Sequence, residues 1–409
     1  MQHVILGNGI AGVSAAEAIR QLDAHANITM ISDEREVPYS RPMISMVLDG
    51  SVPSEKLAIR SERFYRDLNI TPVLGKRVEA IDIDRRRVHL QGGAAIGFDR
   101  LLIATGAEAR RIDAENASLS NIFPMRRQAH VQHMLKVLPG ARRALVLGGG
   151  LVGFKAAYGL MKRGLKVTML ITSAYPLSMQ VDETAGRMIL EELLRHGLEV
   201  RVGVSVVAFE GQTAVTGAKL SNGERLSCDM VVIAKGVVPA HAFVPRDAVD
   251  VDVGILVDEH LATGADGIYA AGDVAQCVDI ARGKPWINAI WPEAAAQGRI
   301  AGLNMAGRPV AYQGSLGRNV IRVFDLDVMT LGLVNPPDDG QYITLTRQDR
   351  RRGIYRKLVL RDNVLVGAIL INALEQGGVL LGLIRSRMPL AIPAKRLLEP
   401  SFNVRQLMH

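Results

Sequence analysis

VILGNGIAG, residues 4–12, is an apolar run that passes directly into the pattern G-x-G-x-x-G. The first glycine permits a tight strand-to-helix turn, the second lets the backbone approach a pyrophosphate, and the third lets the helix pack on the strand. Residues 13–22 have apolar side chains at helical spacing, and residues 28–31 form an apolar run that predicts a second strand ending at Asp33 and Glu34. An acid about 20 residues after the glycines suits a ribose 2′-hydroxyl. The stretch predicts a dinucleotide-binding unit; a glycine-rich turn of another α/β unit is the alternative.

Composition narrows the class of protein. The chain has 409 residues, enough for two or three domains, and 48% hydrophobic residues with 40 glycines, as expected of an α/β protein with tight turns. Cys228 and Cys277 are the only cysteines and are far apart, which excludes a disulfide framework and a C-x-x-C pair and favours a reducing, cytoplasmic setting. The first strand starts at the N-terminus, so we expect no signal peptide, and no apolar run predicts a membrane span.

The net charge of +8 comes in short arginine runs at residues 85–87, 126–127, 142–143 and 350–352. Solvated turns are the interpretation we favour, and a patch that attracts an acidic protein partner is the alternative. We expect no nucleic-acid partner, because aromatic residues make up only 4% of the chain and no nucleic-acid-binding motif accompanies the charge.

The opening pattern recurs at residues 144–153, ALVLGGGLVG, followed by a predicted helix over 154–163 and a strand over 167–171. Two such fingerprints imply two dinucleotide sites. The second lacks an acid after its strand, where Ile171-Thr172-Ser173 stand, and no arginine follows that could pair with a 2′-phosphate. Lys155, just inside the helix, opposes the helix dipole, so we expect either a partner or ligand for it or an exposed position.

Other predicted strands end in small residues suited to a nucleotide. Residues 98–103 lead to Ala104-Thr105-Gly106, residues 229–234 to Lys235-Gly236, and residues 267–271 to Gly272-Asp273. We expect helices over residues 56–67, 182–195 and 293–306. From about Gly317, strands over 321–324, 328–331, 342–346, 355–360 and 365–372 and a helix over 378–385 predict an antiparallel sheet domain.

The ordered motifs G7NGIAG12, Ser40-Arg41-Pro42, A104TG106, G148GGLVG153, 234–239 and A271GD273 resemble the FAD-dependent pyridine nucleotide–disulfide oxidoreductase superfamily. The C-terminal part is similar to the cap domain of NADH:rubredoxin reductases and of the nitrite reductase flavin module. Lys155 and the missing acid are more similar to a branch found beside carbon monoxide dehydrogenases. The resemblance implies an α/β fold with two Rossmann-like domains, one for FAD (1–110 and 240–315) and one for NAD(P) (111–239), and a C-terminal α+β interface domain (316–409).

The resemblance also implies roles for individual residues. Glu34, or Asp33, would bind the adenosine ribose of FAD, Val78 the adenine, Arg41 and Pro42 the isoalloxazine, and Trp291 its other edge. The residues expected at FAD are Gly7, Gly9, Ile10, Ala11, Gly12, Asp33, Glu34, Arg41, Pro42, Val78, Ala104, Thr105, Gly106, Gly272, Asp273 and Trp291. Those expected at NAD(H) or NADP(H) are Gly148, Gly150, Leu151, Val152, Gly153, Lys155 and Gly236. Most relatives have a glutamate near the nicotinamide where Lys155 stands, so Arg41 and Lys155 are the candidate catalytic residues; no metal site is expected.

No cysteine lies in residues 37–51, where disulfide-reducing members of the superfamily carry theirs. Electrons must therefore leave the flavin directly. The leading hypothesis is an FAD-dependent NAD(P)H oxidoreductase that exchanges electrons with rubredoxin, ferredoxin or another iron–sulfur protein, working as a homodimer. The alternatives are an FAD-containing electron-transfer or assembly subunit with a decayed nicotinamide site, and an NADH oxidase.

Overall fold

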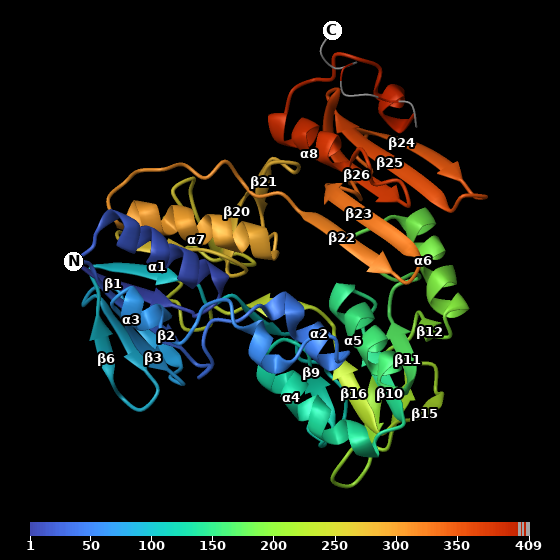
Figure 1. Ribbon diagram of the computed structural model, residues 1–409, viewed down its shortest axis with the longest axis horizontal. Coiled ribbons are helices and arrows are strands. Elements are labelled where there is room, and N and C mark those ends of the chain that lie inside the picture. The colour runs from blue at the N-terminus through green and yellow to red at the C-terminus, as the bar shows by residue number, and fades with distance from the viewer. Residues whose placement is uncertain (400–401, 403–404, 406–409) are drawn as a thin grey trace. The chain divides into compact units, whose positions relative to one another are not determined.

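A computed structural model describes residues 1–399, 402 and 405 (Figure 1). The chain forms two compact units, each built from separate segments. Unit 1 contains residues 1–42, 57–108 and 238–317, and unit 2 contains residues 43–56, 109–237 and the chain from 318 onward. Strands β8 (Ala107–Ala109) and β17 (Val237–Pro239) lie where the chain passes between the units. The predicted NAD(P) and C-terminal domains thus both fall in unit 2, and their division remains a prediction.

A five-stranded parallel sheet, in the order β19-β7-β1-β2-β3, forms the centre of unit 1. Its strands are β1 (Gln2–Leu6), β2 (Asn27–Ser32), β3 (Ile70–Leu74), β7 (Arg100–Ile103) and β19 (Ile268–Ala270). The three central strands are almost entirely buried, as expected of a parallel sheet covered on both faces. The predicted α/β fold class is confirmed.

Helices α1 (Ile10–Leu22) and α7 (Trp291–Met305) pack closely side by side in unit 1 (Figure 1). A Cβ at Gly298 would lie 2.1 Å from the carbonyl oxygen of Ala11, and one at Gly302 would lie 2.5 Å from that of Ala15. The two helices therefore run in the same direction, with backbones too close for any side chain at these glycines. Gly298 is seven residues after the start of α7, whereas Ala11 beside it is one residue after the start of α1. At a rise of 1.5 Å per residue, the N-terminus of α7 therefore extends about 9 Å beyond that of α1.

The rest of unit 1 is a set of small sheets and short helices. Strands β4 (Val78–Asp82), β5 (Arg87–Leu90) and β6 (Ala95–Gly97) form one antiparallel sheet; β18 (Ile255–Leu256), β20 (Ala275–Asp279) and β21 (Lys284–Trp286) form another. The prediction of one helix over residues 56–67 is wrong: η2 (Ser54–Leu57) and α3 (Phe64–Asp67) are separate turns. Between them Ala58 bridges to Tyr39, and the amide of Ile59 donates to Pro38, so extended pairing replaces the helix.

Unit 2 contains a second parallel sheet, in the order β12-β11-β10-β16-β9. Its strands are β9 (Ile122–Pro124), β10 (Arg143–Leu147), β11 (Lys166–Ile171), β12 (Glu199–Val202) and β16 (Met230–Ile233). The helices are α2 (Ile44–Leu48), α4 (Gln128–Val137), α5 (Leu151–Lys162) and α6 (Glu183–Arg195). Asp182 caps α6 by accepting from the amide of Ala185, which explains the predicted helix start. Strands β13 (Val206–Glu210), β14 (Gly217–Leu220) and β15 (Arg225–Ser227) form an antiparallel sheet of their own.

The C-terminal part of unit 2 is an antiparallel sheet in the order β22-β23-β26-β25-β24. Its strands are β22 (Arg318–Val323), β23 (Leu326–Gly332), β24 (Tyr342–Asp349), β25 (Ile354–Arg361) and β26 (Val364–Ile371), followed by α8 (Gly377–Ser386) and η4 (Ala394–Leu398). The predicted strands and helix are confirmed, with bounds that differ by at most three residues at either end. Lys357, buried within β25, pairs with Asp182 at 3.0 Å and so joins this sheet to the start of α6.

Candidate functional site: two dinucleotide cradles

Both fingerprints adopt the same backbone conformation. The first glycine has φ +121° at Gly7 and +120° at Gly148, a region that favours glycine. A Cβ at Gly7 would lie 2.1 Å from the carbonyl oxygen of Ala104, and one at Gly148 would lie 2.3 Å from that of Ala234. Each turn is thus pressed against the end of a neighbouring strand, as predicted for a strand-to-helix turn.

The second and third glycines have opposite surroundings. A Cβ at Gly12 would lie 2.1 Å from the oxygen of Gly7, and one at Gly153 would lie 1.9 Å from that of Gly148, so both pack against their own turn. At Gly9 and Gly150, the N-caps of α1 and α5, a Cβ would meet no atom of the described residues within 4 Å, apart from the adjoining ones. Each helix N-terminus therefore opens onto free space with no cap side chain, which fits the pyrophosphate of a bound dinucleotide.

The acid after β2 is part of a small polar cluster in unit 1. The Glu34 carboxylate accepts a hydrogen bond of 2.6 Å from the Tyr39 hydroxyl and forms an ion pair with Arg41. The Arg41 guanidinium also donates to the Tyr39 oxygen at 3.0 Å. Sequence reasoning placed Glu34 at the adenosine end of FAD and Arg41 at the ring end; the structure brings the two side chains together. The role of Tyr39 was not predicted, because a tyrosine before Ser40-Arg41 gives no sign in the sequence that it contacts Glu34.

The corresponding position of the second fingerprint carries no acid. The amide of Gly7 donates to Ile31, and the amide of Gly148 donates to Leu170, which places Ser173 where the first site has Glu34. Ile171 is buried, with its Cγ2 2.5 Å from where a Cβ of Gly149 would be. The ribose of a dinucleotide would thus meet a serine hydroxyl here.

The remaining predicted FAD residues lie in unit 1. Gly272 has φ +81°, and a Cβ there would lie 3.2 Å from Cβ of Ala11, so the Gly272–Asp273 turn adjoins the first fingerprint. The Gly272 amide donates to the Gln297 side chain at 2.8 Å, a positioning contact that the sequence did not indicate. The Thr105 hydroxyl donates to the carbonyl oxygen of Ala240 at 2.7 Å. The other members are Ala104, Gly106, Val78 in β4, exposed Asp33, Pro42 and the half-buried Trp291 at the start of α7.

The predicted NAD(P) residues lie in unit 2. Leu151 and Val152 begin α5, and Gly236 follows β16 with φ +87° and no atom within 4 Å of a Cβ. Lys155 on α5 has an exposed side chain, and Lys235, the second residue after β16, is half-buried; partial desolvation lowers the pKa of both ammonium groups. Neither ammonium makes a hydrogen bond or ion pair with any residue that the structure describes.

Neither cysteine is placed for redox chemistry. Both are free and buried, Cys228 in unit 2 and Cys277 in unit 1. Burial raises the pKa of Cys228 to about 12 and also raises that of Cys277, so both thiols stay protonated.

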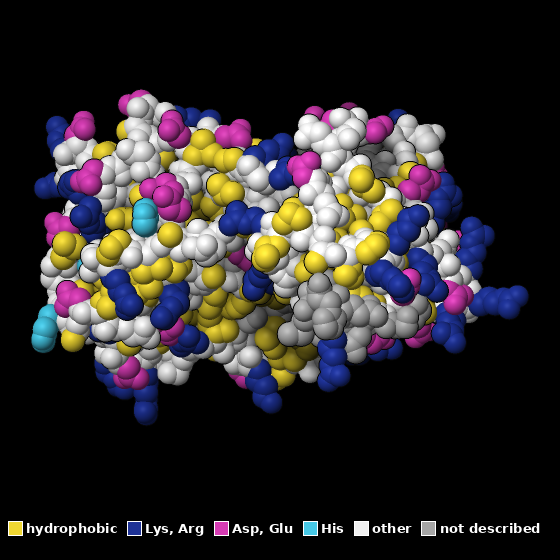
Figure 2. All heavy atoms as spheres, turned by 90° about the horizontal axis from the view of Figure 1, so that it is seen from above, with side chains coloured by type: hydrophobic (Ala, Val, Ile, Leu, Met, Phe, Trp, Pro, Cys, Tyr) yellow, Lys and Arg dark blue, Asp and Glu magenta, His cyan; other side chains and the backbone are white. Residues whose placement is uncertain are grey.

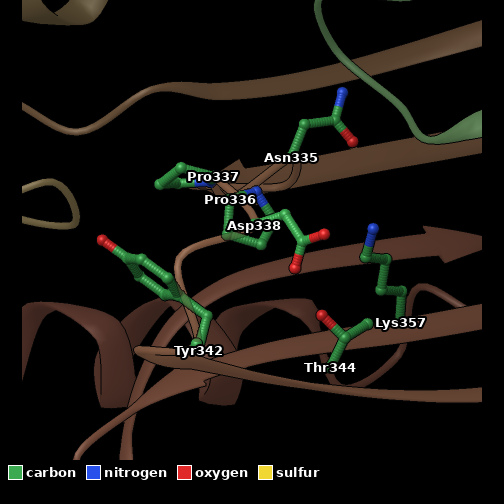
Figure 3. A pocket seen from close by; sticks show the side chains of 8 residues that line it. Asn335, Pro336, Pro337, Asp338, Tyr342, Thr344 and Lys357 are labelled. Atoms are coloured by element: carbon green, nitrogen blue, oxygen red, sulfur yellow. The ribbon is translucent and has the colours of Figure 1, made fainter.

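Some arginines of the short basic runs form ion pairs at the surface. Arg85 pairs with Asp82 at 3.2 Å, and Arg86 pairs with Asp266 at 2.7 Å. Figure 2 shows basic side chains spread over the visible face with acidic ones between them. A hollow of about 320 Å³ in the C-terminal sheet domain, lined by Asn335, Pro336, Pro337, Asp338, Gly340, Tyr342, Thr344 and Lys357, contains none of the predicted site residues (Figure 3). No helix of the described chain is long and apolar enough to cross a membrane.

Comparison with known proteins identifies the family. The chain belongs to the pyridine nucleotide-disulphide oxidoreductases, whose model matches residues 1–298, and the rubredoxin NAD+ reductase C-terminal domain matches residues 318–388. The protein is therefore an FAD-dependent NAD(P)H oxidoreductase with two Rossmann-like domains, and the predicted family, enzyme class and cofactors are confirmed.

Several relatives match nearly the whole chain. The NADH-dependent phenylglyoxylate dehydrogenase subunit epsilon of Aromatoleum evansii is 30% identical over 95% of this chain and 92% of its own. The ferredoxin–NAD(+) reductase component of the biphenyl dioxygenase system of Paraburkholderia xenovorans is 28% identical over 99% and 97%. Two Bacillus subtilis relatives are longer, and the chain spans about half of each (51% and 49%). Among solved structures, the putidaredoxin reductase–putidaredoxin complex matches 100% of this chain and 98% of that chain at 25% identity and TM-score 0.90.

Proposed function

We propose that the protein passes electrons between NAD(P)H and an iron–sulfur protein through FAD, with FAD in the cradle of unit 1 and the nicotinamide dinucleotide in the cradle of unit 2. The observation that carries this proposal is the pair of matching turns, each with an open glycine at a helix N-terminus, in a chain whose two thiols are buried and protonated. When bound, FAD supplies hydride exchange with the nicotinamide and single-electron exchange with the protein partner.

In unit 1, the chain's own residues would bind and orient FAD. The N–H groups at the start of α1 face the pyrophosphate, and the Gly272–Asp273 turn beside Ala11 lies next to them. We assign Glu34 and Arg41 together to the adenosine half, since one ion pair cannot serve both ends of an extended FAD molecule. We place the ring half near the projecting first turns of α7, which contain Trp291.

The electron partner is proposed from the relatives. The curated relatives include rubredoxin-NAD(+) reductases of Pseudomonas putida and Ectopseudomonas oleovorans and ferredoxin reductase components of dioxygenase systems. A net charge of +8 favours an acidic carrier, because opposite charge steers association. We further propose a cytoplasmic location, consistent with two free cysteines, the three-domain division given above and a homodimer through the C-terminal domain.

Anaerobic stopped-flow mixing tests the proposal. Purified protein should show a flavin spectrum that NADH or NADPH bleaches, and addition of oxidised rubredoxin or a two-iron ferredoxin should restore it. Protein without flavin, or flavin that neither nucleotide reduces and no reduced iron–sulfur protein reduces, would contradict the proposal. Size-exclusion chromatography with light scattering, run on the same sample, tests the homodimer.

A second candidate has its own observation. Ser173 in place of an acid and Lys155 within α5 depart from the expected nicotinamide site, and the relative from Aromatoleum evansii is a subunit of a larger dehydrogenase. An FAD-containing electron-transfer subunit with a decayed nicotinamide site would account for both. Flavin that is reduced by an iron–sulfur protein but by neither nucleotide would favour this candidate over the first.

A further inference from the structure

The edge of the unit 2 sheet that faces the second cradle carries positive side chains and no acids. In parallel α/β sheets, ligands bind outside the carboxyl ends of the strands. Here those ends lead into residues 125–127 after β9, 148–150 after β10, 172–175 after β11 and 234–236 after β16, all within the described chain. These segments contain Arg126, Arg127 and Lys235, and no aspartate or glutamate.

The strand order indicates which half of a dinucleotide each cation meets. The order reverses next to β10, which has β11 on one side and β16 on the other. The adenosine ribose lies over the strand after the first helix, here β11, so the nicotinamide half extends over β16 and β9. Lys235 is the second residue after β16 and therefore belongs to the nicotinamide half.

Lys155 faces the same half. It lies one turn before Gly159 on α5, and therefore on the same face of the helix. A Cβ at Gly159 would lie 3.2 Å from Cγ of Leu48, so this is the face against which α2 packs. Helix α2 also packs against α4, the connection from β9 to β10. The face of α5 with Lys155 is therefore turned toward the β16–β9 side of the fingerprint.

Neither lysine is neutralised by the described part of the chain. Lys155 is exposed and Lys235 is half-buried, and partial desolvation alone lowers the pKa of each, with no carboxylate opposing it. Lys162, two turns further along α5, instead lies 3.7 Å from the Asp49 carboxylate. Two uncompensated cations beside one half of a ligand weaken the binding of a ligand with a positive charge in that half, relative to a ligand that is uncharged there.

We propose that Lys155 and Lys235 make the second cradle select the reduced nicotinamide, whose ring is uncharged, over the oxidised nicotinamide, whose ring is a cation. The inference rests on the proposed nicotinamide site of unit 2. Pyrophosphate and riboses are common to both forms, so the ring charge alone separates them. By Coulomb's law at a permittivity between that of protein and water, each lysine changes the ratio of the two dissociation constants about threefold to tenfold.

Selection of the reduced form has a consequence for the direction of the reaction. Hydride transfer to NAD(P)+ would take two electrons and one proton from reduced flavin; the iron–sulfur protein of the proposed function would resupply the two electrons one at a time, and solvent would supply the proton. A site that binds NAD(P)H tenfold more tightly than NAD(P)+ raises the potential of the bound nicotinamide by about 30 mV. The two lysines therefore favour nicotinamide reduction over nicotinamide oxidation.

Equilibrium binding to the FAD-loaded protein tests the proposal without turnover. The probes are NAD+, tetrahydro-NADH, a redox-inactive analogue with an uncharged ring, and ADP-ribose, which has no nicotinamide ring. The variants are Lys155→Gln and Lys235→Gln, with Lys162→Gln as the matched control on the same helix. We expect the wild type to bind tetrahydro-NADH at least about tenfold more tightly than NAD+, and each test variant to lower that ratio about threefold to tenfold by strengthening NAD+.

The outcomes separate this inference from the function on which it rests. The control variant should keep the wild-type ratio, and the ADP-ribose affinity reports any change at the shared phosphates. Equal affinities for the two ring forms, or a ratio that neither test variant changes, would overturn the inference and leave the nicotinamide site standing. Failure of all three probes and of their 2′-phosphorylated counterparts to bind would overturn the nicotinamide site itself, and the inference with it.

Discussion

Substitution of the middle glycines should remove the two cofactors one at a time. Gly9 has φ −84° and ψ −176°, and Gly150 has φ −80° and ψ −177°, both in the extended region that alanine adopts without strain. Apart from the adjoining residues, no atom of the part of the chain that the structure describes lies within 4 Å of a Cβ at either position. Gly9→Ala and Gly150→Ala should therefore fold normally and place a methyl group only where a pyrophosphate must approach.

The size of the effect follows from the hydrogen bonds that the methyl group displaces. A backbone N–H that donates to a charged group contributes about 1.5–3 kcal/mol. Loss of one such bond raises the dissociation constant about 10- to 100-fold. Gly9→Ala should weaken FAD by this factor, and Gly150→Ala should weaken NAD(P)H while FAD stays bound.

Gly12→Ala and Gly153→Ala are the matched comparisons. A Cβ at these positions would lie 2.1 and 1.9 Å from a backbone oxygen, so the helix must move by about 1 Å, at a cost of about 1–3 kcal/mol in stability. Flavin fluorescence measures FAD binding, and the affinity for an NAD+ analogue measures binding at the second cradle. Thermal unfolding of the flavin-free proteins measures stability. A Gly150→Ala variant that binds the nicotinamide dinucleotide normally, or a flavin-free Gly9→Ala variant as unstable as Gly12→Ala, would refute the reasoning.

Three further predictions follow from single contacts. Arg41→Gln should weaken FAD binding at least about tenfold, because it removes the partner of Glu34. The flavin midpoint potential, measured by spectroelectrochemical titration, should stay unchanged. A shifted potential would instead place Arg41 beside the isoalloxazine ring. Cys228→Ala and Cys277→Ala should retain electron transfer, and the native thiols should resist a disulfide reagent at pH 8, since burial raises the pKa of both; loss of transfer with FAD retained would contradict this. Burial lowers the pKa of His3 to about 4, below its value in the unfolded chain, so the unfolded state binds the proton first as the pH falls. The free energy of unfolding should therefore fall by about 2 kcal/mol between pH 6.5 and pH 4. His3→Asn should remove this part of the pH dependence in urea titrations.

The elements that the sequence predicted well are those whose geometry is local. A backbone φ near +120° favours glycine over other residues, so the first position of each turn is marked in the sequence by Gly7 and Gly148. The spacing of the glycines was therefore enough to identify both cradles. The C-terminal sheet was predicted for a similar reason, because alternating side chains and short turns specify antiparallel strands over neighbouring residues. In each case the pattern that reveals the element is local, although its packing partners, such as Ala104 beside Gly7, lie far along the chain.

The errors and omissions come from tertiary contacts. Residues 58–63 have helical propensity, yet the pairing of Ala58 with Tyr39 and of Ile59 with Pro38 holds them extended. The Arg41–Glu34 ion pair is equally invisible in the sequence, because both residues had plausible separate ligands. Lys357 lies in an apolar strand and gains its partner, Asp182, from a segment 175 positions earlier, so no local pattern predicts its burial.

The two cradles share a backbone and differ in how they hold the rest of a dinucleotide. The first adds the Glu34 carboxylate, which is fixed by Tyr39 and Arg41 and offers a charged acceptor to a ribose hydroxyl. The second offers Ser173 there, whose hydroxyl already donates to the Tyr175 carbonyl oxygen. With no acid at that position, a ribose hydroxyl gains no charge-assisted bond and a 2′-phosphate meets no repulsion. Affinity at the second cradle therefore rests on the phosphates and the N-terminus of α5, and this charge-based contact makes it the more salt-sensitive of the two.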